Sequence, residues 1–278
     1  MPFRDDIPAT MDSYPYVTGM GFRNRCHMVF DEFRNDPASS VSSNGQFVFV
    51  KTDYIKLFED NVLPLIDYDI NIITHNSALG INEDCISLLE NPKIINWFAQ
   101  NANFPHPKLL SLPLGLANYR WMHGDYNLIQ SVNSDPLVRE HLMYMNFDVS
   151  TNSKKRTPIQ ETFLNKTFVK QSGPKPFGEY IADLRKSKFT VSPPGAGIDC
   201  HRIWESISVG TIPVVERCHN ISFYEDMPIL IVDDWGDIDE DYLNGQYEEI
   251  LKNTSKDKLF LDYWIDKIGL LPKRGVTT

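Results

Sequence analysis

The sequence predicts an α/β protein with two Rossmann-like lobes, each built on a parallel sheet, and a cleft between the lobes. Short segments rich in β-branched and aromatic residues alternate with segments of helical periodicity, which is the pattern of strands covered by helices on both faces. The alternation runs twice, with a break near residues 130–140. The length of 278 residues suits two modest domains.

Composition and charge exclude several classes of protein. Hydrophobic residues make up 42% of the chain and charged residues 23%, which is ordinary for a globular protein. No apolar run reaches the ~18 residues of a membrane span, and the net charge of -10 disfavours nucleic acid as a partner. The N-terminal segment lacks the apolar core of a signal peptide. With four widely spaced cysteines read as free thiols, we expect a cytoplasmic protein.

The first lobe is predicted to cover residues 1–135. Residues 1–45 are expected to be irregular, because glycine, proline and serine recur there. The segments that follow alternate between strand-like and helical patterns: strands over 46–53 and 69–77, helices over 53–66, 81–91 and 123–132, and short apolar runs at 93–101 and 108–116.

The second lobe is predicted to cover residues 136–255. Its strands are expected over 141–149, 188–195, 211–216 and 228–235, and its helices over 157–168, 177–187, 198–210 and 241–253. The remaining segment, 256–278, contains an amphipathic aromatic helix over 260–268 that could pack back across the first lobe.

Basic residues gather in one part of the second lobe. Between Thr151 and Thr190 nine lysines and arginines face three acidic residues, although the whole chain is acidic. Such a local excess indicates a small anionic ligand rather than a long polyanion. A solvated basic face fits the same counts.

The segment from Phe189 to Val215 is the most informative in the chain. A strand ends at Ser192, and after two prolines Gly195 and Gly197 allow a tight bend and close backbone approach. Asp199 is expected to cap the helix that follows. The free N–H groups at the start of that helix would favour an anion.

Two side chains of this helix add to the anion site. Arg202, in or just after its first turn, can give phosphate oxygens a bidentate donor. Glu205 lies three residues further on the same face, where its carboxylate can accept from ribose hydroxyls. The spacing is neither GxGxxG nor a P-loop, so a purely structural strand-to-helix turn fits it equally well.

This segment resembles the exostosin-type (family 47) glycosyltransferases. The resemblance covers about residues 143–241, and the pattern R-x-x-E-(x4)-G-x-x-P-V beginning at Arg202 is its most specific part. The short chain resembles the soluble versions encoded by large algal viruses. The resemblance implies a GT-B fold, a UDP-sugar donor (UDP-xylose favoured), inversion at the anomeric carbon and no required metal. It also implies a glycan acceptor, such as fucose on a viral capsid N-glycan.

The donor is expected at the carboxyl ends of the second-lobe strands. The resemblance assigns the diphosphate to side chains after the first of these strands and to the glycine loop, the departing charge to an arginine, and the ribose to a glutamate. The residues concerned are Thr151, Asn152, Arg156, Ser192, Gly195, Gly197, Asp199, Arg202 and Glu205.

Inversion requires a general base, which we expect from the first lobe. Asp53 and His75 follow the first two predicted strands and are the candidates, although Asp53 also fits a helix N-cap. His123 and Asp125 are third choices. Side chains suited to hydroxyl-rich acceptors are Asn76, Asn118, Arg120 and Trp121.

Two other functions fit the sequence. A metal-dependent GT-A transferase could use the acidic run at residues 233–241 to hold Mg²⁺ or Mn²⁺. A carbohydrate-binding module could keep the fold without turnover. The sequence does not fix the oligomeric state.

Overall fold

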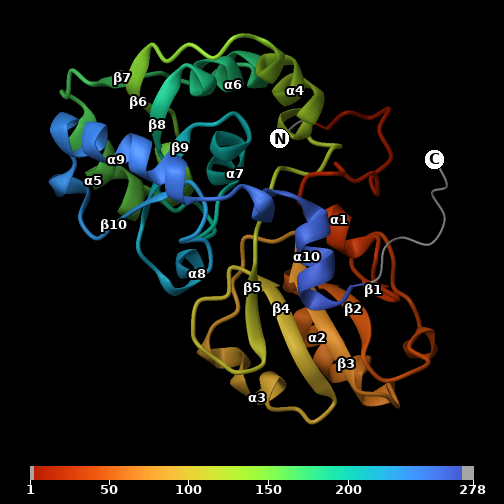
Figure 1. The fold of residues 1–278 in the computed structure, drawn as a ribbon. Helices are drawn as coiled ribbons and strands as arrows, with labels where there is room; N and C mark the ends of the chain where they lie inside the picture. Colours follow the sequence, from red (N-terminus) through yellow and green to blue (C-terminus); the bar gives the residue numbers. More distant parts are fainter. Residues whose placement is uncertain (1–2, 271–278) are drawn as a thin grey trace.

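Two parallel sheets organise residues 3–270, the part of the chain that the computed structural model describes (Figure 1). Residues 1–2 and 271–278, which belong to the predicted segments 1–135 and 256–278, lie outside the described residues. Each sheet has five strands, and every strand pair is parallel. The predicted fold class is confirmed: the protein is α/β, with two Rossmann-like domains, each built on a parallel sheet.

The sheet of the first domain has its strands in chain order, β1-β2-β3-β4-β5. The strands are short and apolar because both faces of the sheet are covered. Their bounds are β1 Met28–Phe30, β2 Gln46–Lys51, β3 Ile70–His75, β4 Ile94–Gln100 and β5 Leu109–Leu112.

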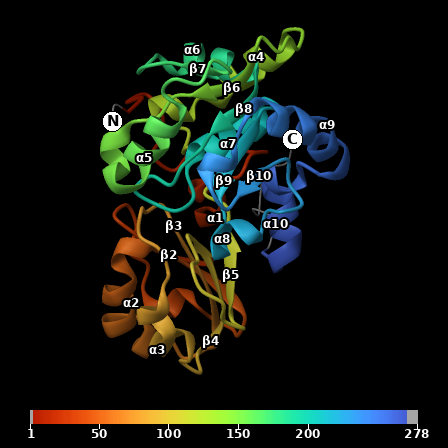
Figure 2. The same ribbon diagram turned by 90° about the vertical axis from the view of Figure 1, so that its left-hand side faces the viewer.

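Different parts of the chain cover the two faces of this sheet. On one face lie α2 (Ile55–Asn61) and α3 (Ile86–Leu89), which bury Phe58 and Leu89 against it. Figure 2 shows these helices on one side of the sheet and α10 on the other. The second face packs against α1 (Gly19–Arg23) and α10 (Leu261–Ile268), so the end of the described chain returns to the first domain.

The sheet of the second domain has the order β10-β9-β8-β6-β7, so the chain reverses direction across the sheet between β7 and β8. Helices α5 and α9 cover one face and α6 and α7 the other. The strands are β6 His141–Met145, β7 Val169–Gln171, β8 Ser187–Val191, β9 Ile212–Glu216 and β10 Leu230–Val232. The helices are α5 Ser153–Phe163, α6 Phe177–Arg185, α7 His201–Ser208, α8 His219–Ser222 and α9 Glu240–Asn253.

The two domains share one apolar core. It joins Phe49 of the first sheet and Trp264 of α10 to Trp204 of α7. The segment between β5 and β6 forms α4 (Tyr126–Ser134), which packs against α6 of the second domain (Figure 1). The domains are therefore joined covalently twice, before α4 and between α9 and α10.

The prediction that residues 1–45 are irregular is wrong. They contain α1 and β1, which are only five and three residues long. The Thr18 hydroxyl caps α1 by accepting a hydrogen bond from the Gly21 N–H at 3.1 Å. Elements this short carry no periodic signal, and tertiary contacts hold them in place.

Candidate active site

The strand order of the second domain creates a crevice at the carboxyl edge of its sheet. β6 and β8 are neighbours, but the chain leaves β6 toward β7 and leaves β8 toward β9, on opposite sides. The two loops therefore diverge, which is the switch-point geometry where open α/β sheets bind ligands. Most of the predicted donor-binding residues lie in or next to these loops.

Arg156 holds the two loops together. Its Nε donates to the Pro194 carbonyl at 3.0 Å and its Nη2 donates to the Pro193 carbonyl at 3.1 Å. Its Nη1 donates to Thr151 Oγ1 at 2.6 Å and to the Asp148 carbonyl at 2.8 Å. These neutral acceptors use most of its donors and leave its positive charge at the crevice without a carboxylate.

Asn152 and Gly195 complete the link between the loops. The Asn152 amide donates to the Gly195 carbonyl at 2.9 Å, and the Asn152 side chain also caps α5. A Cβ at Gly195 would lie 2.9 Å from Arg156 Nη2, so the loop approaches this guanidinium as only glycine permits. The structure thus brings together Thr151, Asn152, Arg156 and Gly195, which the sequence places in one site.

Arg202 supplies a second cation at the same edge. The guanidinium carbons of Arg202 and Arg156 lie 5.9 Å and 5.4 Å from the centroid of the Phe147 ring. Among residues 3–270, neither arginine forms an ion pair, and the buried Arg202 Nε has no hydrogen-bond partner. Burial and the charge of Arg202 both lower the pKa of Arg156. Arg156 has no carboxylate partner and Arg202 has only the buried Glu205 carboxyl nearby, so the two cations together favour an anion.

Glu205 is enclosed between α6 and α7. The residue is 5% exposed, and its carboxylate accepts a hydrogen bond from the Tyr180 hydroxyl at 2.9 Å. Burial raises the pKa of Glu205 to about 7, although the nearby Arg202 charge acts in the opposite direction. Glu205 therefore lies beside Arg202, as the sequence predicts, but its carboxylate lines neither cavity described below.

The prediction that Asp199 caps α7 is wrong. The helix starts after Cys200, and no side chain caps it. Asp199 instead accepts hydrogen bonds from the Leu114 N–H and from the Trp204 Nε1–H, both at 2.8 Å. Because Leu114 belongs to the first domain, the buried Asp199 carboxylate links the domains, and burial raises its pKa to about 7.

A cavity of about 460 Å³ lies between the domains, here called the interdomain cavity. The first domain lines it with the segments after β3 and β4, and the second domain lines it with the Ser192–Ile198 loop and the segment after β9. Two of its lining atoms, Ser192 Oγ and Asn101 Nδ2, are buried without a hydrogen-bond partner. A buried polar atom without a partner is costly, so both are suited to contact a polar ligand.

Asn101 was not identified from the sequence. It follows β4 with φ at 56° and is 1% exposed, and its Oδ1 accepts from the Asp199 N–H at 2.9 Å. A Cβ at Gly197 would lie 2.7 Å from Asn101 Nδ2, so Gly197 is needed for this close approach. The available signal was the polar run that follows an apolar strand, which marks a carboxyl-edge position in an α/β sheet.

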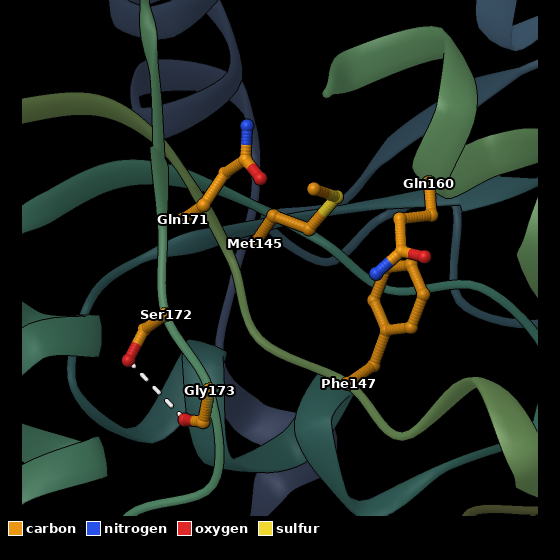
Figure 3. Close-up of a pocket in the computed structure, with 6 residues that line it drawn as sticks. All are labelled: Met145, Phe147, Gln160, Gln171, Ser172 and Gly173. Carbon is orange, nitrogen blue, oxygen red and sulfur yellow. Dashed lines mark hydrogen bonds between the residues drawn. The ribbon is translucent and has the colours of Figure 1, made fainter. Parts of the chain in front are cut away.

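A second cavity, of about 310 Å³, lies wholly within the second domain and is called the second-domain cavity (Figure 3). It is found where β6 and β7 end, beside α5. Its lining residues are Met145, Phe147, Gln160, Gln171, Ser172 and Gly173. Phe147 therefore contacts this cavity and also lies beside the two arginines.

The two predicted bases are placed differently. His75 is 1% exposed: its Nε2–H donates to the Pro113 carbonyl at 3.0 Å and its Nδ1 accepts from the Asn76 N–H at 2.7 Å. Burial lowers the pKa of His75 to about 4, so the ring is neutral with neither nitrogen free. Asp53 is exposed in a 3-10 turn after β2, and its side chain caps no helix.

The two third-choice residues, His123 and Asp125, differ in their contacts. The His123 ring lies 5.8 Å from that of His201, the first residue of α7. Burial lowers the pKa of His123 to about 4, and no hydrogen bond to its ring nitrogens is present among residues 3–270. Asp125 pairs with Arg4 at 2.8 Å and caps α4, which gives it a structural role.

The proposed acceptor-binding side chains form two pairs on the first domain. The Asn118 amide donates to Asn76 Oδ1 at 3.0 Å, and its Oδ1 accepts from a backbone N–H of α1 at 3.0 Å. Trp121 and Arg120 both lie against the ring of Phe3. These contacts hold the side chains in place and leave their role in acceptor binding a prediction.

The acidic run that could have held a metal has other partners. Asp234 and Asp239 cap the starts of the next helical segments, and Asp233 pairs with Arg217 at 2.8 Å. Within residues 3–270, no cluster of three or more His, Cys, Asp or Glu side chains is arranged to hold a metal ion. Nor does this part of the chain contain a helix with the length and apolar character needed to cross a membrane.

Comparison with known proteins relates the second domain to a known family. Residues 139–266 match the family model of the RXYLT1 C-terminal domain. The second domain is similar to this family. The match confirms the resemblance to exostosin-type glycosyltransferases that the motif at Arg202 indicates.

Solved structures and curated proteins were also compared. Similar structures include the alpha,alpha-trehalose-phosphate synthase (UDP-forming) of Burkholderia vietnamiensis, with 9% identity, 81% of this chain and 71% of that chain covered, and a TM-score of 0.46. The corresponding synthase of Burkholderia multivorans has 9% identity, 84% and 71% coverage and the same TM-score. The search of curated proteins found no match.

Proposed function

We propose that this protein is an inverting glycosyltransferase that moves a sugar from a UDP-sugar to a hydroxyl group of a glycan acceptor. The RXYLT1-type second domain supports the class of reaction. The observation that carries the proposal is the pair of arginines, Arg156 and Arg202, which lie at the switch point and form no ion pair within residues 3–270, although the buried Glu205 lies near Arg202. A nucleoside diphosphate is an anionic leaving group, so it can provide the negative charge that balances the two arginines.

The chemistry needed from the second domain is charge stabilisation. As the bond from the anomeric carbon to the diphosphate breaks, negative charge grows on the diphosphate oxygens. Arg202 has an unpartnered buried Nε and can donate to those oxygens, whereas Arg156 contributes mainly its charge, because backbone carbonyls occupy most of its donors. Preorganised donors of this kind stabilise the developing charge without metal chemistry.

The first domain would supply the acceptor hydroxyl and the base. Asp53 is exposed near the carboxyl edge of the first sheet and is our proposed base. His123 is the alternative, because its neutral ring lies against the first residue of α7. His75 is less suited than either, since both of its ring nitrogens are hydrogen-bonded in the fold.

The identity of the sugars rests on resemblance. The RXYLT1-type match favours xylose, and therefore UDP-xylose, as the donor. A fucose residue of a viral capsid N-glycan remains the proposed acceptor. A non-catalytic carbohydrate-binding module would use the same fold but would not need the unpaired arginines.

The test is binding followed by turnover. Purified protein is screened by thermal unfolding against UDP-xylose, UDP-glucose, UDP-galactose and UDP, because a ligand that binds the folded state raises its stability. We expect UDP-xylose to stabilise most and to be consumed when a fucosylated glycan is added. Arg202→Ala should weaken UDP binding by roughly 10–100-fold, as expected for loss of charge-assisted hydrogen bonds.

Each result has a clear consequence. Lys188→Ala, which removes a half-buried cation that lies over the Tyr247 ring and lines neither cavity, is the control. Binding of UDP-sugar without transfer to any acceptor would favour the non-catalytic module. Unchanged UDP affinity in Arg202→Ala would contradict the role given to this arginine.

A further inference from the structure

Three basic side chains, here called the cation cluster, meet at the amino edge of the second-domain sheet. Arg139 precedes β6, Arg185 ends α6, and Lys256 lies between α9 and α10. Arg139 donates to groups at the amino ends of β8 and β9, and the other two cations lie beside it. Arg156 of the candidate active site lies past the opposite end of β8, a strand of roughly 15 Å at ~3.3 Å per residue. The cation cluster is therefore separate from the candidate active site.

The two arginines of the cation cluster are held by the ends of helices. Arg139 donates to the carbonyl of Arg185, the last residue of α6, and to the carbonyl of Gly210, which follows α7. Arg185 donates to the Asp135 carbonyl at 2.7 Å and to the Asn133 carbonyl at 3.3 Å, both at the end of α4. Carbonyls at a helix end carry partial negative charge and need donors, which accounts for both guanidinium groups. These partial charges stabilise the arginines but do not neutralise them.

Lys256 is not accounted for in this way. Within residues 3–270, its Nζ makes no hydrogen bond and no ion pair, and neither does the carboxylate of its neighbour, Asp257. A Cβ added at Gly210 would lie 3.6 Å from Lys256 Nζ and 3.2 Å from Arg139 Nη2, so both cations approach the same point. Burial and the charges of Arg139 and Arg185 lower the pKa of Lys256. The lysine thus lies against two like charges.

The part of the chain that the structure describes contains no carboxylate paired with the cation cluster. Glu140 follows Arg139 in the sequence, but its carboxylate pairs with Lys186 at 3.0 Å. Burial and the charge of Arg185 lower the pKa of Arg139, while the Tyr247 hydroxyl, 3.2 Å from Arg139 Nε, acts in the opposite direction. Arg185 Nε is buried and has no hydrogen-bond partner. The positive charge of the cluster is therefore left unbalanced by the fold.

The cation cluster has the charge and the free donors to hold an oxyanion. Lys256 Nζ offers three N–H donors, and Arg139 Nη2 uses one of its two N–H groups on Gly210. Lys256 is exposed enough for a ligand to reach it from solvent. Three positive charges exceed what a single carboxylate balances, and the tetrahedral oxygens of a phosphate dianion can accept from several donors at once. A phosphate group is therefore a better match than a carboxylate.

We propose that the cation cluster binds a small phosphate-type anion, either free phosphate or the phosphate group of a monoester, between Lys256, Arg139 and Arg185. This site does not depend on the proposed transferase function. Lys256 lies in the connection between α9 and α10, where the Leu259 carbonyl accepts a hydrogen bond from the first-domain Val17 N–H at 3.0 Å. An anion bound to the cluster would tie this connection to the second domain and so stabilise the contact between the domains.

The experiment measures Lys256 itself. The full chain is labelled briefly with acetic anhydride at pH 8, and mass spectrometry of its peptides gives the acylation rate of Lys256. The control is Lys252, an exposed lysine four positions earlier that forms no ion pair within residues 3–270. Labelling is repeated with inorganic phosphate, glycerol 3-phosphate, acetate and sodium chloride at equal ionic strength, which controls for screening. Because one side chain is measured, phosphate bound at Arg156 and Arg202 does not enter the result.

Saturating phosphate should slow the acylation of Lys256 by about 10-fold or more, because a bound anion keeps the amine protonated and covered, and should leave Lys252 unchanged. Protection by glycerol 3-phosphate as well would identify the ligand as a phosphate monoester or free phosphate, and protection by inorganic phosphate alone would identify it as the free ion. Protection no greater than with sodium chloride or acetate, or equal protection of Lys252, would overturn the proposal.

A pair of variants gives a second measurement. Lys256→Met keeps the length of the side chain but removes its charge, and Lys252→Met is the matched control at an exposed position. Without phosphate, Lys256→Met should unfold at the same temperature as the unaltered protein or higher, because repulsion within the cation cluster is reduced. With phosphate, its unfolding temperature should rise less than that of Lys252→Met. An equal rise in the two variants would contradict the assigned site and leave the proposed function untouched.

Discussion

Replacement of Glu205 by glutamine should make the protein more stable at alkaline pH than at acidic pH, relative to the unaltered protein. The Glu205 carboxyl is buried between α6 and α7, and burial raises its pKa from 4.5 to about 7. Tyr180 on α6 and Arg202 on α7 are the polar groups that face it. A glutamine there can still accept the Tyr180 hydrogen bond through its Oε1, but it never ionises.

The sign and size of the effect follow from linkage. A folded-state pKa above the unfolded value means that the folded state prefers the protonated acid, so stability is lost as the pH rises from about 4.5 through about 7. At ~1.4 kcal/mol per pH unit, the ionised Glu205 costs roughly 3 kcal/mol above neutral pH. About 2.5 kcal/mol of this loss falls between pH 5 and pH 8. Asp199 titrates in the same direction in both proteins and cancels in the comparison.

The assay is urea unfolding of both proteins at pH 5, 6, 7 and 8. The free energy of unfolding of Glu205→Gln minus that of the unaltered protein should increase by about 2.5 kcal/mol across this range. Glu179→Gln is the control, because it makes the same chemical change at an exposed side chain of α6. A difference that stays constant from pH 5 to pH 8 would show that the buried carboxyl does not titrate as argued here.

Two more predictions concern the base and a close backbone contact within the first domain. Asp53→Asn should bind UDP-sugar normally but lower kcat by ~10²–10⁴-fold if Asp53 is the base; normal turnover in this variant, with loss in His123→Gln, would transfer the role to His123. Gly115→Ala should destabilise the protein by several kcal/mol, because φ is +70° and a Cβ would lie 2.1 Å from the Val17 carbonyl oxygen. Gly245→Ala, where a Cβ meets nothing within 4 Å, should be neutral or stabilising in the same thermal unfolding experiment.

The sheets were predictable because each long strand is a contiguous apolar segment. The segments expected around 46–53 and 69–77 became β2 and β3 with boundaries shifted by only a few residues. Local pattern was sufficient there, since strands buried on both faces need little else to be recognised. The short α1 and β1 gave no such pattern and were missed.

The sequence predicted which loops form the site, but it did not predict the partners of the buried carboxylates. Arg156, Asn152 and Gly195 meet because the loops after β6 and β8 share one edge of the sheet, which topology dictates. The partner of Asp199 is Leu114, 85 positions earlier in the chain, and that contact cannot be read from the spacing around Asp199. Its place as an interdomain link became visible only in three dimensions.

The return of α10 to the first domain has a practical consequence for anyone who divides this protein. A fragment with the limits of the family match, residues 139–266, would include most of α10 without the sheet on which it rests, and Leu261 would lose the first-domain residues that it contacts. The same fragment would lack α4, which covers α6. The matched segment and the structural unit therefore have different limits: the packed unit of the second domain begins at α4 and ends after α9. In the intact chain, the two domains can move apart only if both of their connections bend. These connections are the segment before α4 and the segment between α9 and α10.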